Sequence, residues 1–256
     1  MTFPVVGLCG QAGSGKDLVA DFFVEKKFAK VAFSDPMKRF CQQLFNLDYG
    51  QLWGPSEARN RSIVYTEEVW EKLLDSASGF CWELIDDLGI KQRCPALLGL
   101  WDWLGTLYRS EPLSARIILQ TLGTEWGRTL DKNIWINYLY EKIYPRLRVG
   151  DDYRDEDGAW PSPSTLEPFV GMVVPDHRFA NEILATRERD GYMIHITRPG
   201  RPSELRDPGV EKHPSEEEQK TLASDFFHLE LELPEGLENV KAVLEDLWQK
   251  APWLHG

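Results

Sequence analysis

The chain has 256 residues, of which 42% are hydrophobic and 27% are charged, as in an ordinary soluble globular protein. This length fits one large domain, or one core domain with an inserted lid. The formal net charge is −12, which disfavours sequence-independent nucleic-acid binding, and no apolar run is long enough to span a bilayer. We therefore expect no nucleic-acid or membrane partner, and any anionic substrate must be attracted by a local basic cluster.

The cysteines and the N-terminus both bear on the cellular compartment, and both favour the cytoplasm. None of the four cysteines forms a C-x-x-C pair or has metal-ligand spacing with a histidine. The N-terminus lacks the basic-then-apolar pattern of a signal peptide. Both observations favour reduced thiols in the cytoplasm, with Cys9 as a small buried hydrophobe.

The first predicted elements are a short buried strand over 5–9, a glycine-rich turn, and a helix that starts near Lys16. The turn at 10–17 matches G-x-x-x-x-G-K, but Asp17 stands where this motif normally has Ser or Thr.

This turn has the residue types that a phosphate chain requires. The absence of Cβ atoms at Gly10, Gly13 and Gly15 lets several backbone N–H groups approach an anion together. The helix dipole favours the same charge, and Lys16 can reach the outer phosphates. The alternative is a glycine turn that only links a strand to a helix; the apolar strand before it and the helix after it favour phosphate binding.

A second strand is predicted over 28–33, followed by a helix from Pro36 to Phe45 with Ser34 or Asp35 as its cap. Asp35 and Lys38 then follow the carboxyl end of a parallel strand, where open α/β sheets bind ligands. The alternative for Lys38 is a solvated helix face.

The sequence pattern that indicates helices and strands is weaker over residues 46–110. Residues 46–62 are loop-like, a helix is expected over 66–74, and the Trp-rich stretch 76–110 is punctuated by glycines. We expect 46–110 to be a partly helical insertion within a single domain over 1–256, serving as a lid or an oligomer surface. Its tryptophans are expected to pack rather than to stack on a ligand.

Two clear helices are predicted over 113–130 and 133–148. The first has Gln120, Thr124 and Arg128 on its polar side. A cation near a helix end is favoured anyway, which is the structural alternative for Arg128. Residues 150–168 form an acidic, Pro- and Gly-rich stretch that predicts an exposed loop.

A continuous apolar run over 169–174 predicts a buried parallel strand. Asp176 at its end has the Walker-B arrangement, which holds Mg²⁺ or orients its water, and Arg178 can reach a phosphate from the same crevice. His177 between them is interpreted as a loop residue.

A short helix over 181–190 precedes a strand over 192–197 that ends at Arg198. Apolar and polar residues alternate over 226–233, which predicts a half-exposed strand at the edge of the sheet. A helix over 237–250 completes the prediction. The fold class is therefore α/β, a mostly parallel sheet flanked by helices. Lysine, arginine and aspartate at the strand ends form the set that phosphoryl transfer requires.

Several segments together resemble the phage-type deoxynucleoside monophosphate kinases, which are P-loop proteins. These segments are GLCGQAGSGKD, FSDPMKRFCQQLF, LQTLGTEWGR, PDHRFANE with ITRPG, and His213-Pro214-Ser215-Glu216. They occur in the family's order and span most of the chain, but they do not cover the Trp-rich middle or the acidic loop.

The resemblance implies transfer of the γ-phosphoryl of ATP to a deoxynucleoside monophosphate, with Mg²⁺, in a homodimer and in the cytoplasm, that of the host if the chain is phage-encoded. ATP phosphates would be bound by Gly10, Ala12, Gly13, Ser14, Gly15 and Lys16, with Arg198 on the lid side. The acceptor would be bound by Asp35, Lys38, Gln120, Thr124, Arg128, Asp176 and Arg178.

The resemblance also assigns the catalytic and metal roles. Lys16, Asp17, Arg128 and Arg178 would be catalytic, and Asp17 and Asp176 would serve the metal. The family often has Thr directly after the P-loop Asp; Leu18 stands here and cannot bind metal or phosphate, so Asp17 or water must serve alone.

Two other functions stay open from the sequence. One is another small-molecule P-loop kinase, such as dephospho-coenzyme A kinase, and the other is an ATP-dependent switch protein. The bases accepted are also open, and their pocket is expected to involve 35–61 and the variable middle.

Overall fold

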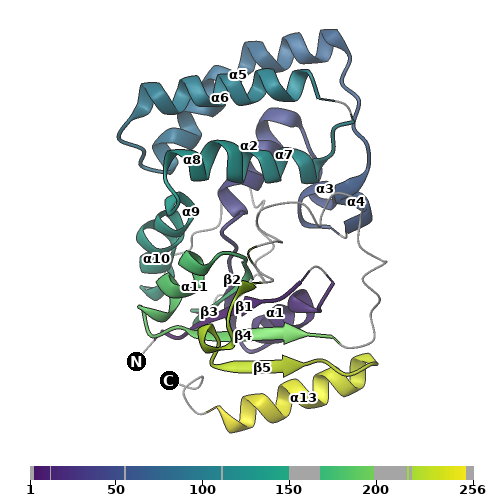
Figure 1. Cartoon of the computed structure of the whole chain (residues 1–256), viewed down its shortest axis with the longest axis vertical. Helices are drawn as coiled ribbons and strands as arrows, with labels where there is room; N and C mark the ends of the chain where they lie inside the picture. Colours follow the sequence, from purple (N-terminus) through teal and green to yellow (C-terminus); the bar gives the residue numbers. More distant parts are fainter. Residues whose placement is uncertain are drawn as a thin grey trace. The chain divides into compact units, whose positions relative to one another are not determined.

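The computed structural model describes residues 3–11, 13–54, 56–110, 112–149, 168–198, 218 and 221–251. The chain divides into two compact units (Figure 1). Unit 1 comprises Met1–Phe33 and Leu139–Gly256, and unit 2 comprises Ser34–Tyr138. The expected insertion at 46–110 lies wholly within unit 2. Of the expected loop at 150–168, only Pro168 is among the described residues.

Unit 1 is built on a five-stranded sheet in which every neighbouring pair is parallel, in the order β2-β3-β1-β4-β5. The strands are β1 (Val5–Cys9), β2 (Phe28–Lys30), β3 (Gly171–His177), β4 (Tyr192–Thr197) and β5 (Leu229–Glu232). The α/β class with a parallel sheet is therefore confirmed.

Helices cover both faces of this sheet. Those of unit 1 are α1 (Lys16–Glu25), α10 (Tyr144–Arg148), α11 (Ala180–Arg187) and α13 (Leu237–Lys250), with a 3₁₀ turn at Ser224–Phe226. One core joins α1 and α13 to the sheet through Phe22, Phe23, Val240 and Leu244, and a second core includes Ile183 of α11. Because parallel strands are buried on both faces, β1 reads as an unbroken apolar run.

Two strand boundaries differ from the prediction. The strand expected over 28–33 ends at Lys30, because the Phe33 N–H donates to the Asp176 side chain (2.9 Å) instead of a strand carbonyl. The strand expected over 169–174 runs to His177, because His177 pairs with Cys9 beyond an irregularity in the register. Asp176 and His177 are thus part of the strand, and placing His177 in a loop was wrong.

Unit 2 is helical. Its elements are α2 (Asp35–Phe45), α3 (Tyr49–Trp53), α4 (Ser56–Asn60), α5 (Glu67–Asp87), α6 (Arg93–Tyr108), α7 (Ala115–Thr121), a π-helix η1 (Leu122–Gly127), α8 (Arg128–Leu130) and α9 (Ile134–Asn137). A second π-helix, η2 (Tyr138–Ile143), begins at the last residue of the unit.

Residues 46–110 contain more helix than the sequence pattern predicted. Two short helices, α3 and α4, occupy the stretch expected to be a loop, and the helix expected over 66–74 continues to Asp87. The Trp-rich stretch supplies the rest of α5 and all of α6. Helix α6 carries apolar residues on its exposed side as well as on its buried face, which weakens the periodicity that the prediction depended on.

The tryptophans pack, as expected. The Trp103 ring contacts Phe40 and Phe45, and its Nε1 donates to Thr121 Oγ1 (2.9 Å). A Cβ at Gly99 of α6 would come within 3.2 Å of the Trp126 indole, so glycine here permits the close approach of that ring.

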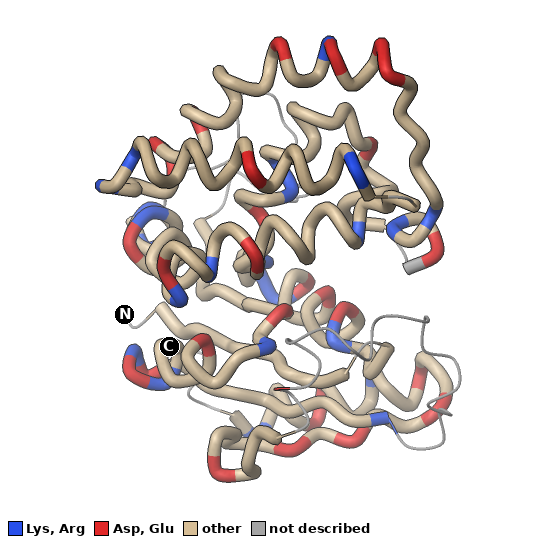
Figure 2. Tube along the Cα trace, turned by 45° about the horizontal axis from the view of Figure 1, so that its top comes forward, with Lys and Arg blue, Asp and Glu red and all other residues tan. Residues whose placement is uncertain are grey.

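Figure 2 shows Lys and Arg interspersed with Asp and Glu in both units, rather than gathered in one of them. Among the described residues, no helix is long and apolar enough to cross a membrane.

Candidate phosphate-binding site

The loop between β1 and α1 is held in a conformation that only glycine adopts readily. Gly10 and Gly15 have φ angles of 150° and 99°. A Cβ at Gly10 would lie 2.4 Å from the Ile196 carbonyl oxygen and 2.8 Å from Ser14 Oγ. Side chains are therefore excluded from the loop both by the backbone angle and by the end of β4.

No side chain caps the start of α1 at Gly15. In α11, by contrast, Glu182 Oε2 accepts from the backbone N–H groups of Arg178 (2.7 Å) and Phe179 (3.1 Å). The start of a helix that lacks such a cap favours an anionic ligand, because its first N–H groups have no intrahelical partner.

Ser14 adds a polar group to the same loop. Ser14 is 7% exposed, and its Oγ is buried with no hydrogen-bond partner among the described residues. A buried hydroxyl without a partner is costly and uncommon in a folded protein. A phosphate oxygen in the loop would satisfy it, so the residues present fit a phosphate chain.

Lys16 lies against the loop that it follows. Its Nζ donates to the carbonyl oxygens of Gly10 (2.5 Å) and Gln11 (2.8 Å). The positive charge is therefore held at the mouth of the loop. Ala12, the remaining predicted contact, lies outside the described residues.

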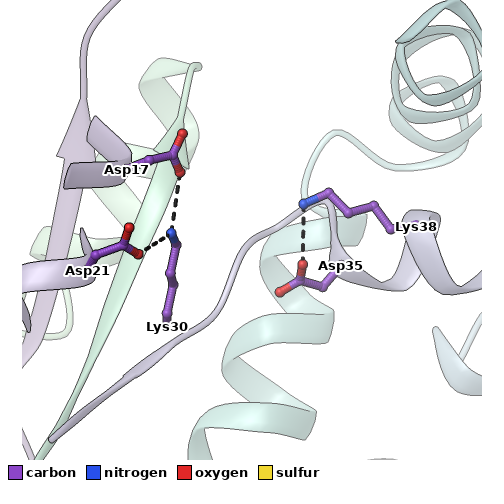
Figure 3. Close-up of polar contacts among 5 residues, drawn as sticks. All are labelled: Asp17, Asp21, Lys30, Asp35 and Lys38. Atoms are coloured by element: carbon purple, nitrogen blue, oxygen red, sulfur yellow. Dashed lines mark hydrogen bonds and ion pairs between the residues drawn. The ribbon is translucent and has the colours of Figure 1, made fainter. Parts of the chain in front are cut away.

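Asp17 is on the exposed side of the first turn of α1. Its side chain is 81% exposed, and its Oδ1 lies 3.4 Å from Lys30 Nζ, which also contacts Asp21 Oδ1 at 2.8 Å (Figure 3). Partial burial acts to lower the pKa of Lys30, but the hydrogen bond to Asp21 and the charge of Asp17 raise it above its ordinary value.

Asp176 is half-buried near the carboxyl end of β3. Its Oδ1 accepts from Phe33 N–H, so the chain just after β2 is attached to this carboxylate. The segment 30–33 thus contacts both predicted metal-binding carboxylates, Asp17 through Lys30 and Asp176 through Phe33.

These carboxylates are the kind of ligand that Mg²⁺ takes when substrate phosphates and water supply the rest of its shell. Among the described residues, no group of three or more His, Cys, Asp or Glu side chains could hold a metal without such help. The residues present therefore fit a metal shared with phosphate.

Two arginines also belong to unit 1. The charges of Arg178 and Lys16 both act on the Cys9 thiol, although burial dominates and raises the pKa of Cys9 to about 11. Arg178 and Lys16 therefore lie near the same end of β1. Arg198 directly follows β4 and is half-buried, two residues after the Ile196 carbonyl that borders the loop.

The other predicted residues belong to unit 2. Asp35 is buried at the start of α2, and its Oδ1 lies 3.5 Å from Lys38 Nζ, which lies 5.7 Å from the centre of the Trp53 ring (Figure 3). Lys38 is therefore held by packing, which contradicts the alternative of a solvated helix face.

Gln120, Thr124 and Arg128 are half-buried along α7, η1 and α8, and Arg128 donates to the Lys132 carbonyl (3.2 Å). The π-helix beside them depends on close packing. A Cβ at Gly127 would lie 2.3 Å from the Trp135 ring, whose Nε1 donates to the Gly123 carbonyl (3.0 Å). The glycines in LGTEWGR are thus packing residues, and π-helical turns of this kind often occur at functional sites.

A hollow of about 430 Å³ lies in unit 2 and overlaps the range expected for the base pocket. Its lining includes Asn46, Gln51, Tyr65 and Lys72. The Tyr65 hydroxyl donates to the Phe45 carbonyl (2.9 Å), so it is already engaged. The assignment of a base pocket stays a prediction.

Sequence reasoning missed Lys30. It is the last residue of β2 and the partner of Asp17. Its position at a strand end was hidden from the sequence, because the strand predicted over 28–33 put Lys30 in the middle, whereas β2 ends there.

A parallel sheet in the order β2-β3-β1-β4-β5, with a glycine-rich loop and a lysine between its central strand and the following helix, is consistent with the P-loop kinase class of α/β proteins. No family model matches the chain. A protein of Acanthamoeba polyphaga mimivirus, provisionally named a deoxynucleotide monophosphate kinase, is 28% identical over 222 residues, which are 86% of this chain and 84% of that protein. The similarity supports a nucleotide kinase.

Proposed function

We propose that the protein transfers the γ-phosphoryl group of ATP to a deoxynucleoside monophosphate, giving the diphosphate. The observation that supports this proposal is the loop at 10–16, which combines glycines of positive φ, the buried Ser14 hydroxyl and the Lys16 ammonium held at the Gly10 carbonyl. The mimivirus relative supports the choice of a nucleotide as substrate.

At the donor end, the backbone N–H groups of the loop bind the phosphates of ATP, and Lys16 places its charge on the outer ones. Mg²⁺ would neutralise part of the charge of the ATP phosphates. Asp17 and Asp176 are the side chains that would hold it. A rigid donor site of this kind lowers the barrier because its charges are already oriented.

At the acceptor end, Arg128 and Arg178 bind the acceptor phosphate or the group in transfer, and Arg198 serves the donor from the lid side. Asp35, Lys38, Gln120 and Thr124 orient the nucleoside. An oxygen of the acceptor phosphate attacks the γ-phosphorus while the bond to the β-phosphate oxygen breaks. Arginine suits this role because its fork of N–H groups matches phosphate oxygens.

The test is incubation with ATP, Mg²⁺ and each deoxynucleoside or ribonucleoside monophosphate in turn, with dephospho-coenzyme A as an additional acceptor. We expect a deoxynucleoside diphosphate to form. Phosphorylation of dephospho-coenzyme A alone would favour the other kinase, and slow ATP hydrolysis that no acceptor changes would favour a switch protein. Light scattering on the same sample tests the proposed homodimer.

Asp17→Asn is expected to reduce turnover at least about tenfold while the protein stays folded, because an exposed amide replaces a carboxylate without loss of packing. The measurement is steady-state kinetics with thermal unfolding as the control. Glu25→Gln, at an exposed carboxylate on the far end of the same helix, is the matched variant and should retain turnover. Near-normal turnover of Asp17→Asn would show that the metal does not need Asp17.

Arg128→Ala is expected to raise the KM for the monophosphate or to lower kcat, by about tenfold or more, while ATP alone still binds. Arg109→Ala, an exposed arginine at the end of α6, is the control. Equal loss of ATP binding in Arg128→Ala would instead place this arginine on the donor side.

A further inference from the structure

Asp17 introduces an electrostatic problem at the P-loop. The residue after the loop lysine normally carries a neutral hydroxyl, whereas Asp17 carries a negative charge at the first turn of the helix that receives phosphate. Like charges at short range repel each other unless something neutralises one of them. Without Mg²⁺, a loop that binds phosphate next to a carboxylate therefore needs a compensating cation other than Lys16, which serves the phosphates.

Lys30 is in the position to supply that cation. Its Nζ lies 3.4 Å from Asp17 Oδ1 and 2.8 Å from Asp21 Oδ1, between two carboxylates one helical turn apart (Figure 3). The shorter contact anchors the ammonium to Asp21, which is farther from the loop along α1. The same ammonium then faces Asp17.

The Lys30 side chain is less exposed than the lysine of an ordinary surface ion pair, although the Asp17 side chain is 81% exposed. The Lys30 side chain is 29% exposed, whereas Lys72 and Lys250, which form i,i+4 pairs on helix surfaces, are each 73% exposed. The backbone of Lys30 is in register with Val173 of β3, so the strand ladder fixes its position. Less freedom is therefore lost when Lys30 holds a partner.

We propose that Lys30 is the counter-charge of Asp17, so that the two side chains together present no net charge where the P-loop motif usually presents a hydroxyl. Lys30 is thus a positioning residue that acts on the phosphates through Asp17. The proposal rests on the proposed function, since the phosphate chain concerned is that of ATP. It also accounts for how this loop tolerates an aspartate.

The experiment is a double-mutant cycle on ATP binding, measured calorimetrically without any acceptor, in EDTA and then with Mg²⁺. In EDTA, Lys30→Met is expected to weaken ATP binding about fivefold to tenfold, the size of an interaction between charges that water partly screens. Asp17→Asn should bind ATP at least as well as the wild type. The double variant should bind like Asp17→Asn, because without the carboxylate there is no charge to compensate.

Two matched variants and a salt series test the mechanism. Lys26→Met removes another ion-paired lysine, 24% exposed and bonded to Glu245 beyond the far end of α1, and should leave ATP affinity unchanged. Lys30→Arg keeps the charge and should restore affinity. The loss in Lys30→Met should shrink as NaCl is raised from 0.05 to about 0.5 M, since salt screens exposed charges. Lys30→Gln replaces Lys30→Met if thermal unfolding shows that the methionine variant is unfolded.

Several results would overturn the proposal. Unchanged metal-free ATP affinity in Lys30→Met would show that Asp17 needs no counter-charge. An equal loss in the Asp17→Asn background would show that Lys30 acts on phosphate directly or through the fold. If the wild-type protein binds ATP and the Lys30→Met variants give either of these results, only this inference fails. If the wild-type protein binds no ATP, the proposed function fails as well.

Discussion

Lys16→Met is expected to lower phosphoryl transfer at least about a hundredfold, the largest effect on activity that we predict for a single side chain. Lys16 directs its ammonium at the mouth of the loop, where it contacts the Gly10 and Gln11 carbonyls. The negative charge that develops on the phosphates in the transition state would lose the stabilising positive charge of the Lys16 ammonium. Removal of one such fixed donor typically costs a factor of about 10²–10³ in rate.

The measurement is kcat and kcat/KM for ATP with the best acceptor from the panel. Lys26→Met is the control here too, since it removes one ion-paired lysine just beyond the other end of the same helix. The fold should not change in Lys16→Met, because the hydrogen bonds described for its ammonium reach only the Gly10 and Gln11 carbonyls of the loop that it follows. Activity within about threefold of the wild type would contradict a phosphate-binding role for Lys16.

The second large effect is on stability and comes from His177. This side chain is completely buried, and its Nε2 lies 2.7 Å from Thr186 Oγ1, which the Tyr140 hydroxyl also contacts at 2.6 Å. Its Nδ1 lies 3.2 Å from the Val174 carbonyl oxygen. Because a carbonyl can only accept, Nδ1 of the neutral ring carries the proton, and Nε2 and the Glu182 carbonyl (3.0 Å) both lie within hydrogen-bonding distance of the Thr186 hydroxyl.

Burial lowers the pKa of His177 to about 4, despite the nearby charge of Asp176, which acts in the opposite direction. An unfolded histidine titrates near its ordinary pKa of about 6.5. Between these values the unfolded chain binds a proton that the folded chain does not, so stability falls as the pH is lowered. The contribution is complete above about pH 6.5, and roughly 3 kcal/mol of it is lost by about pH 4.

Urea unfolding at pH 7, 6 and 5 measures this loss. We expect His177→Gln to be less stable than the wild type at pH 7 but to depend less on pH, because the other titrating groups are common to both proteins. Parallel pH dependences would contradict the assignment. If the variant does not fold, imidazole NMR signals of the wild-type protein serve instead, and His177 should show no titration down to about pH 5.

The same residue shows where sequence reasoning reached its limit. His177 was interpreted as a loop residue because it follows the apolar run that ends at Val174. In the structure the strand continues through His177, since Thr186 and the Val174 carbonyl satisfy the ring that it buries. A buried polar residue with partners nine positions away in another element leaves no periodic signal in the sequence.

The Trp-rich stretch was underestimated for a related reason. Helix α6 buries one face but also carries exposed apolar side chains, such as Leu98 and Tyr108, so its sequence lacks the simple apolar stripe of a surface helix. Glycines such as Gly99 were interpreted as breaks, whereas Gly99 lies inside α6 and makes room for Trp126. Only the packing of unit 2 distinguishes such a glycine from a turn residue.

By itself the sequence determined β1, the glycine-rich loop and the start of α1, as well as the bounds of β4 and the closing helix α13. Those elements depend on local signals: an apolar run, glycines with positive φ, and regular spacing. The tertiary structure decided which charges meet. Lys30 reaches Asp17 from another element, and Phe33 reaches Asp176 across 143 positions of the chain, because the parallel sheet gathers the carboxyl ends of distant strands at one edge.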